Sequence, residues 1–328
     1  MKIARILIAA VLAGAVSLSA QDLPGWAYGY PPDGSAAAPR AGRGGRGPAA
    51  PDESLMRLPG SEQAFTRAQI RDGFGPADWY PGDHPPMPEI VSHGRRPDIR
   101  ACALCHYPNG KGRAENAPVA GYPVEYFIQQ IDDFRTGARR SADPKKANVN
   151  LMIAMAKAMT DEEIRASAEY FGAMKWTPWI KVVETNMVPK TQIAGGLFIP
   201  LEGTEQEPIG QRIIEVPENT ERTQVFRDPR SGFIAYVPVG SIKKGEVLAS
   251  TGGGKTIQCT ICHGSNLNGS GPVPGIAGRS PSYLVRQMYD TQHGARNGLW
   301  ADLMKPVVAK LSEEDLLNIA AYVSSLAP

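Results

Sequence analysis

The stretches ACALCHYP (101–108) and QCTICHGS (258–265) decide the class of this 328-residue chain. They contain every cysteine of the sequence, and each has the pattern C-x-x-C-H. This pattern is the attachment signal of c-type haem. Two thiols reach the two vinyl groups on one porphyrin edge, and the adjoining histidine places a ring nitrogen on the iron. We therefore predict two covalently bound haem c groups, held by Cys102, Cys105, His106, Cys259, Cys262 and His263.

Two other uses of paired cysteines fit the sequence less well. A four-cysteine zinc site usually has both pairs in one small module. Here the pairs lie 157 residues apart, and a histidine follows each pair. Local disulfides or thioredoxin-like redox pairs are the second alternative, but neither pair lies in a βαβ pattern. The cysteine pattern favours haem over either alternative.

The composition and the first twenty residues indicate an exported globular protein. Hydrophobic residues make up 42% of the chain and charged residues 21%, which is enough for a globular core. The net charge of +2 is too small to indicate nucleic-acid binding. Residues 1–20 have a basic start, a short apolar run and small residues before a cleavage position, which predicts a secretory signal peptide, with an uncleaved membrane anchor as the alternative. We expect a periplasmic protein.

The chain contains an internal repeat. Residues 102–139 match residues 259–296 without gaps, with identical residues at 13 of 38 positions. After five extra residues in the first copy, TDEEIRASAEYF (160–171) matches SEEDLLNIAAYV (312–323). Thr160 and Ser312 begin capping boxes, and apolar residues follow at helical spacing. Each copy therefore ends in an amphipathic helix, and an earlier helix is expected at 123–136 and 280–293.

The repeat also selects the second axial ligand of each iron. Met152, Met155, Met159 and Met174 are available in the first copy, but only Met152 aligns with another methionine, Met304. The other three align with Val or Leu and are expected in the core. Thioether sulfur is a soft, neutral ligand that raises the potential of haem iron. We predict His106/Met152 and His263/Met304 as the two axial pairs.

Weaker candidates surround these positions. Shared polar residues are possible contacts for the haem propionates, and a carbonyl near Pro118 and near Pro274 is a candidate acceptor for the ligand imidazole. His293 sits beside a shared glycine, whereas His84 and His93 precede the first motif and are expected to be surface or loop residues. The candidate propionate contacts are Arg139, Arg296, Tyr126 and Tyr283.

The segments outside the repeat also allow some structural predictions. Residues 21–58 are rich in Pro, Gly and Ala and are expected to form a flexible linker. AFTRAQIRDGF (64–74) is a candidate N-terminal helix of the first module, matched by 240–251 before the second. Between the modules, the runs WIKVVET, GLFIP, RIIEV and GFIAYVP predict short strands. The expected division is signal 1–20, linker 21–58, first haem domain 59–176, insert 177–239 and second haem domain 240–328.

These motifs resemble a known family. The two CxxCH motifs, the AG-x4-Y-x3-Q stretch, the shared GAR and the methionine eight residues before the capped helix are similar to those of tandem diheme cytochromes c of the cytochrome c4 type. The resemblance covers about 102–174 and 259–328. It implies a mainly α fold of two class I cytochrome c domains, here with a Pro/Gly-rich N-terminal extension and a β insert. It also implies His/Met haem iron and periplasmic electron transfer.

The leading functional hypothesis is an electron carrier and not an enzyme. An iron with both axial positions filled has no place for a small-molecule substrate, so the partners are other redox proteins, with a membrane oxidase or a dehydrogenase as possible donor or acceptor. One alternative is the cytochrome subunit of an exported dehydrogenase. Another is a diheme cytochrome c peroxidase, in which one haem opens to peroxide, but the paired methionines argue against it.

Overall fold

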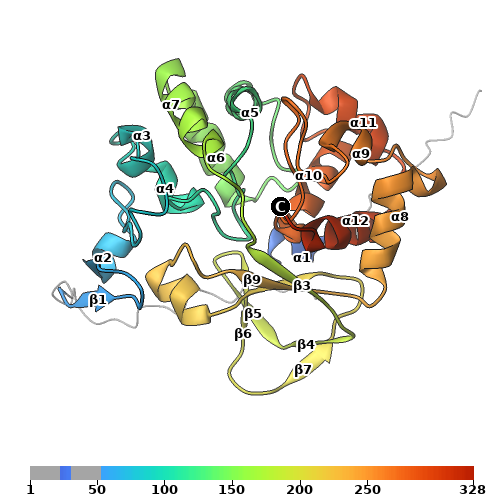
Figure 1. Ribbon diagram of the computed structural model, residues 1–328, viewed down its shortest axis with the longest axis horizontal. Helices are drawn as coiled ribbons and strands as arrows, with labels where there is room; N and C mark the ends of the chain where they lie inside the picture. Colours follow the sequence, from blue (N-terminus) through green and yellow to red (C-terminus); the bar gives the residue numbers. More distant parts are fainter. Residues whose placement is uncertain (1–22, 31–52) are drawn as a thin grey trace, which may run out of the picture.

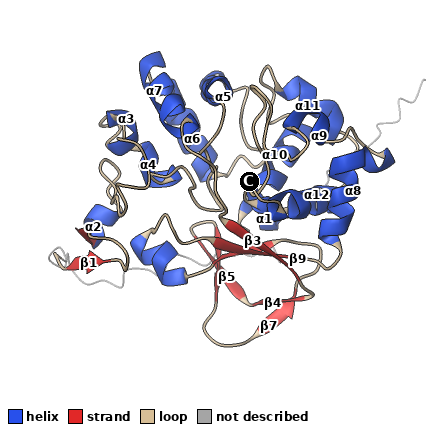
Figure 2. Ribbon diagram, in the orientation of Figure 1, coloured by secondary structure: helices blue, strands red, loops and turns tan. Residues whose placement is uncertain are grey.

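The structure, a computed structural model, describes residues 23–30 and 53–328 (Figure 1). Two groups of helices, one from each copy of the repeat, lie side by side above a region of short strands (Figures 1 and 2). The predicted signal peptide and much of the predicted linker lie outside the described residues. Within the described part of the chain, no helix is long and apolar enough to cross a membrane.

The first helical group follows the sequence signals closely. Pro123 and Thr160 stand just before its two main helices, and Thr160 forms a full capping box with Glu163. Gly137 ends the first of them in the left-handed conformation. The helices are α3 (Glu89–Ser92), α4 (Cys102–His106), α5 (Val124–Thr136), α6 (Ala147–Ala158) and α7 (Asp161–Gly172).

The second helical group repeats this arrangement and adds a long first helix. Ser312 and Asp315 form the second capping box. A Cβ atom at Gly245 would lie 1.9 Å from the backbone oxygen of Asn318, so only glycine allows the first and last helices to cross this closely. The elements are α8 (Ser241–Thr251), the 3₁₀ turn η2 (Gly252–Gly254), α9 (Thr260–His263), α10 (Pro281–Gln292), α11 (Ala301–Val308) and α12 (Glu313–Ser325).

Each helical group has its own apolar core. Met155, Met159 and Met174 are buried in the first core, which confirms the expectation drawn from their Val and Leu counterparts. The second core includes Leu316, Ala320 and Val323 of the last helix, the positions predicted from helical spacing. The repeat therefore predicts which methionines pack as core residues.

Strands occupy the insert. All four runs predicted as strands contain one, which confirms that expectation. β3 (Ile180–Glu184) pairs in parallel with β9 (Phe233–Val237), which pairs antiparallel with β8 (Ile214–Pro217). Two further hairpin-like pairs are β4 (Met187–Pro189) with β7 (Gln206–Pro208), and β5 (Thr191–Ala194) with β6 (Leu197–Pro200). The three-stranded sheet lies beneath both helical groups (Figure 2).

The N-terminal part corrects two expectations. The segment 64–74 forms the strand β2 (Ala64–Thr66), paired with β1 (Leu55–Arg57), and only a single turn, α2 (Arg67–Ile70). The turn stops because the Asp72 carboxylate accepts a hydrogen bond from the Phe74 backbone N–H. In addition, residues 23–30 of the predicted flexible linker are packed, since α1 (Gly25–Tyr28) carries Tyr28, which is only 2% exposed.

Candidate functional site

The first CxxCH motif forms α4, a single turn of helix. Cys102 and Cys105 are free thiols, half-buried, and both line one cavity with His106. Burial raises the pKa of Cys102 to about 11, so the thiol is protonated at neutral pH. The turn therefore presents two thiols and one imidazole to the same space.

The two motif histidines are held in the same way. The backbone oxygen of Ala117 lies 2.8 Å from Nδ1 of His106, and that of Pro274 lies 2.8 Å from Nδ1 of His263. Both acceptors stand eleven residues after their histidine, so in the first copy the acceptor is Ala117 and not Pro118. Burial lowers the pKa of both rings, which keeps them neutral. A neutral ring with Nδ1–H bonded leaves Nε2 as an iron ligand.

Two adjoining cavities share a wall that includes His106 and Met152, together with Phe127, Ile131 and Asn148. Their empty volumes are about 810 and 670 Å³, with space open to solvent included. Met152 lies on α6 and reaches both cavities, whereas Met155 and Met159 line only the smaller one. The structure thus brings His106, Met152 and the two cysteines of the first motif to one cavity.

The larger cavity has a polar end made from both helical groups. Tyr126, Arg139 and Tyr283 line it, and Arg139 donates from Nη2 to Oε1 of Gln287 at 2.8 Å. Arg296 is not part of the lining, but it donates to Oε1 of Gln130 at 2.7 Å. Each arginine therefore crosses to the opposite group, and their backbones meet in an antiparallel bridge.

Two buried basic side chains at this polar end were not predicted from the sequence. Lys146 and Arg286 also line the larger cavity, and Arg286 is 5% exposed. Arg286 donates to the backbone oxygens of Ala27 at 2.6 Å and Ala114 at 2.8 Å. The only available signal was that Arg286 has no counterpart in the first copy of the repeat, where Gln129 stands.

The second motif forms α9, with His263 buried and Cys262 exposed. Met304 lies on α11 and packs, half-buried, against the second core. Burial raises the pKa of Cys259 to about 11, as it does for its counterpart Cys102. The Thr256 hydroxyl donates to the backbone oxygen of Val307, which joins the segment before α9 to α11. The second copy therefore places its methionine-bearing helix next to its cysteine motif.

The remaining histidines lie away from the two cavities. His84 has Nε2 3.2 Å from an oxygen of Asp78, with its side chain 4% exposed, so it is a buried loop residue. The His293 ring stacks on Tyr289 at 3.9 Å. His93 is exposed beside Glu89. Among the described residues that line these cavities, His106 is the one histidine.

The residues present fit a covalently bound haem. Haem is a planar group with an apolar body, two vinyl groups on one edge and two carboxylates on another. The smaller cavity supplies the thiols at an apolar end, and the larger one supplies Arg139, Lys146 and Arg286 at a polar end. His106 and Met152 stand on the wall between these ends. This donor set matches the axial pair of a low-spin cytochrome iron.

Comparison with known proteins agrees with this geometry. Residues 99–175 match the protein-family model described as Cytochrome c. Over 78 residues the chain is 40% identical to cytochrome c-554(548) of Halomonas halodenitrificans, a match that covers 24% of this chain and 94% of that protein. The chain belongs to the cytochrome c family. Its haem is therefore haem c, covalently bound.

Longer matches give the type of cytochrome. Cytochrome c4 of Azotobacter vinelandii is 25% identical over 234 residues, covering 69% of this chain and 84% of that protein. A protein named thiosulfate dehydrogenase electron acceptor, from Stutzerimonas stutzeri, is 28% identical over 236 residues, covering 71% and 82%. The chain is an electron-transfer cytochrome that is similar over about 70% of its length to cytochrome c4.

Proposed function

We propose that this cytochrome is a periplasmic carrier that takes up and releases one electron at each of two His/Met-ligated haems. One haem is attached at Cys102 and Cys105, the other at Cys259 and Cys262. The observation that carries the proposal is the wall shared by His106 and Met152, with Nδ1 of the histidine fixed on a backbone oxygen. The second copy has the same imidazole anchor at His263 and offers Met304 as its sixth ligand.

The bound haem supplies a reversible Fe(III)/Fe(II) couple. The protein around it fixes the ligands and excludes water, which lets the iron change charge with little rearrangement. His106 stays in one tautomer because Ala117 accepts its Nδ1 proton. Met152 gives an uncharged ligand that favours the ferrous state. His106 and Met152 would hold the iron from both sides, so the bound group would supply one-electron exchange and would offer no position to a small-molecule substrate.

The domain arrangement supports transfer between the two haems. The first haem domain spans 59–176 and the second 240–328, joined by the insert 177–239. Their polar ends meet where Arg139 bonds Gln287 and Arg296 bonds Gln130. We propose that these arginines and the neighbouring Tyr126 and Tyr283 hold the propionates at the domain boundary. Residues in these positions would hold the propionates of both haems at the domain boundary.

A partnership with an exported dehydrogenase is the second candidate function. It is favoured by the relatives named thiosulfate dehydrogenase electron acceptor, in Stutzerimonas stutzeri and Thiomonas intermedia. In this case the dehydrogenase is the electron donor, and the insert is available as a binding surface. Stable co-purification with a dehydrogenase from the periplasm would identify a subunit, whereas isolation as a single chain indicates a free carrier.

The number and placement of the haems can be measured directly. The mass of the mature holoprotein is expected to exceed that of the polypeptide by two haems. The double variant Cys259→Ser/Cys262→Ser is expected to keep one haem, and so is Cys102→Ser/Cys105→Ser. Retention of two haems in either variant would contradict the assignment of one haem to each motif.

A further inference from the structure

The two haem motifs differ sharply in how they are covered. In the second motif, Ile261 is 63% exposed and Cys262 is exposed. The residues at the same positions in the first motif, Leu104 and Cys105, are half-buried. Because these are aligned positions of one internal repeat, the difference comes from what packs on each motif and not from the motif itself.

A segment of the insert covers the first motif. The π-helical turn η1 (Arg222–Phe226) is followed by Arg227, whose side chain donates to the backbone oxygen of Leu104 and lies over the Tyr107 ring, 5.6 Å from its centroid. Asn109 donates to the backbone oxygen of Pro229 at 2.9 Å. Residues 222–231, here called the cap, therefore lie against the thioether side of the first haem site.

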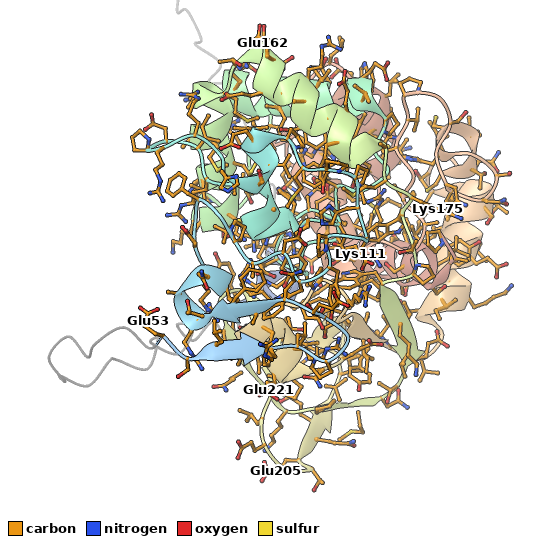
Figure 3. The ribbon with its side chains drawn as sticks, turned by 60° about the vertical axis from the view of Figure 1, so that its left-hand side comes forward. Glu53, Lys111, Glu162, Lys175, Glu205 and Glu221 are labelled. Atoms are coloured by element: carbon orange, nitrogen blue, oxygen red, sulfur yellow. The ribbon has the colours of Figure 1, made fainter. Side chains whose placement is uncertain are left out.

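The N-terminal extension holds the cap in place. The Trp79 indole N–H donates to the backbone oxygen of Phe226 at 2.7 Å, and the two rings lie 5.9 Å apart. Arg230 forms two hydrogen bonds of 2.7 Å with the Asp83 carboxylate. Figure 3 brings this side forward, with Glu221 marking the start of the cap next to the β1–β2 hairpin. The cap is thus a packed layer and not a loose loop.

The second motif has an apolar rim in place of a cap. Ile257 is 46% exposed, Leu299 71% and Leu303 73%. Together with Ile261, these residues form the rim patch, which follows α9 and α11 where Thr256 bonds Val307. The corresponding positions of the first copy are Arg100, Leu104, Ala147 and Leu151, and there both leucines are half-buried.

Charges around the rim patch are paired within the chain. Lys255 lies 2.9 Å from Asp315, and Lys305 lies 2.6 Å from Asp302. These two cations are therefore neutralised locally, and the four members of the patch carry no charge. A surface of this kind fits an uncharged, apolar face on a partner, and its binding depends little on salt.

We propose that the second haem is the port through which this cytochrome exchanges electrons, and that the rim patch docks a redox protein with an uncharged apolar face. This inference rests on the proposed carrier function. One electron passes from the reduced cofactor of the donor to the ferric second haem, and the donor is oxidised by one electron. The second haem then passes this electron to the capped ferric first haem, across the domain boundary, and becomes ferric again.

Access to the two haems is measurable without any partner. A neutral gadolinium chelate relaxes protons steeply according to distance, and the haem methyl protons of the ferric holoprotein are the reporters. The methyl signals of the second haem are expected to relax at least several-fold faster than those of the first. Arg227→Ala, which removes the contact with Leu104, is expected to raise relaxation at the first haem. Equal relaxation in the unmodified protein would overturn the port assignment.

Docking is tested by the rate of electron exchange with azurin, a blue-copper protein with an uncharged apolar face. The double variant Ile261→Lys/Leu303→Lys is expected to exchange electrons at least tenfold more slowly than the unmodified protein. The rate of the unmodified protein is expected to depend little on salt. The matched control Leu55→Lys/Leu201→Lys adds the same two charges at exposed leucines outside the patch and is expected to keep the original rate. Equal rates for the two variants would overturn the docking site. If the unmodified holoprotein exchanges with neither azurin nor a small cobalt complex, the carrier function itself is wrong.

Discussion

Arg279 reaches from the second haem domain into the first and gives a sharp test of how the domains support each other. Its side chain donates from Nη1 to the backbone oxygen of Pro118 at 2.9 Å and from Nη2 to that of Ala120 at 3.0 Å. The residue is 2% exposed. The same loop contains Ala117, whose oxygen holds the ring of His106. Removing the arginine therefore disturbs the support of the first haem ligand.

The expected cost follows from the contacts. Arg279 also donates from Nε to the backbone oxygen of Gly275 at 2.6 Å. Arg279→Met keeps much of the apolar bulk but leaves three backbone oxygens without these donors, at roughly 1–3 kcal/mol each. The guanidinium also lies 4.0 Å from the Tyr122 ring and 4.6 Å from the Trp176 ring, which adds about 1 kcal/mol. Relief from burying a charge offsets part of this loss. We expect the free energy of unfolding to fall by about 3 kcal/mol.

The measurement is urea unfolding, monitored through tryptophan fluorescence, which haem quenches in the folded protein. With a slope of about 3 kcal/mol per molar urea, the midpoint is expected to fall by about 1 M. The control is Arg212→Met. Arg212 also donates to three acceptors, two backbone oxygens at 2.8 and 3.0 Å and the Glu207 carboxylate at 2.6 Å, but all three lie within the insert. A loss below about 1 kcal/mol for Arg279→Met, or an unchanged iron–methionine absorption band at the first haem, would refute the reasoning.

Two further predictions concern local packing and acid stability. Gly245→Ala is expected to destabilise the second haem domain by about 2 kcal/mol, because its Cβ would lie 1.9 Å from the oxygen of Asn318. Gly172→Ala, whose nearest contact would be 3.0 Å, is the milder control, and equal melting temperatures for the two variants would contradict the close crossing. The hydrogen bond from Arg95 lowers the pKa of Glu163, so this pair stabilises the protein above the ordinary glutamate pKa and loses the effect as the pH falls. The difference in the free energy of unfolding between Glu163→Gln and the unmodified protein should therefore be largest near neutral pH and shrink in acid. Its size is expected to stay below about 1 kcal/mol. A difference that is constant with pH would argue against a role for this pair.

Local signals predicted much of the haem domains. The helix expected at 123–136 spans Val124–Thr136, and the capping boxes that begin at Thr160 and Ser312 are both formed. These elements are set by residues three or four positions apart, which a single sequence displays. The internal repeat added further information, because it aligned Met152 with Met304 and predicted Met155, Met159 and Met174 as core residues, which are buried.

Long-range contacts could not be predicted in the same way. The packing of α1 between the domains depends on Tyr28, which donates to the Asp290 carboxylate at 2.6 Å across 262 positions of the chain. Its composition alone predicted a flexible linker for this segment. The cap over the first motif likewise depends on Arg227 and Trp79, which no short pattern connects. Such contacts are decided by burial and charge pairing in the folded chain.

A redox titration of the purified holoprotein, followed at the absorption band between methionine sulfur and ferric iron, tests the His/Met ligation of both haems most directly. We predict two high-potential haems that both show the band and do not readily bind added cyanide. Met152→Ala and Met304→Ala should each remove half of the band, while Met155→Ala should keep it. A haem of much lower potential that lacks the band and opens to cyanide or peroxide would contradict the electron-carrier assignment and favour a diheme peroxidase.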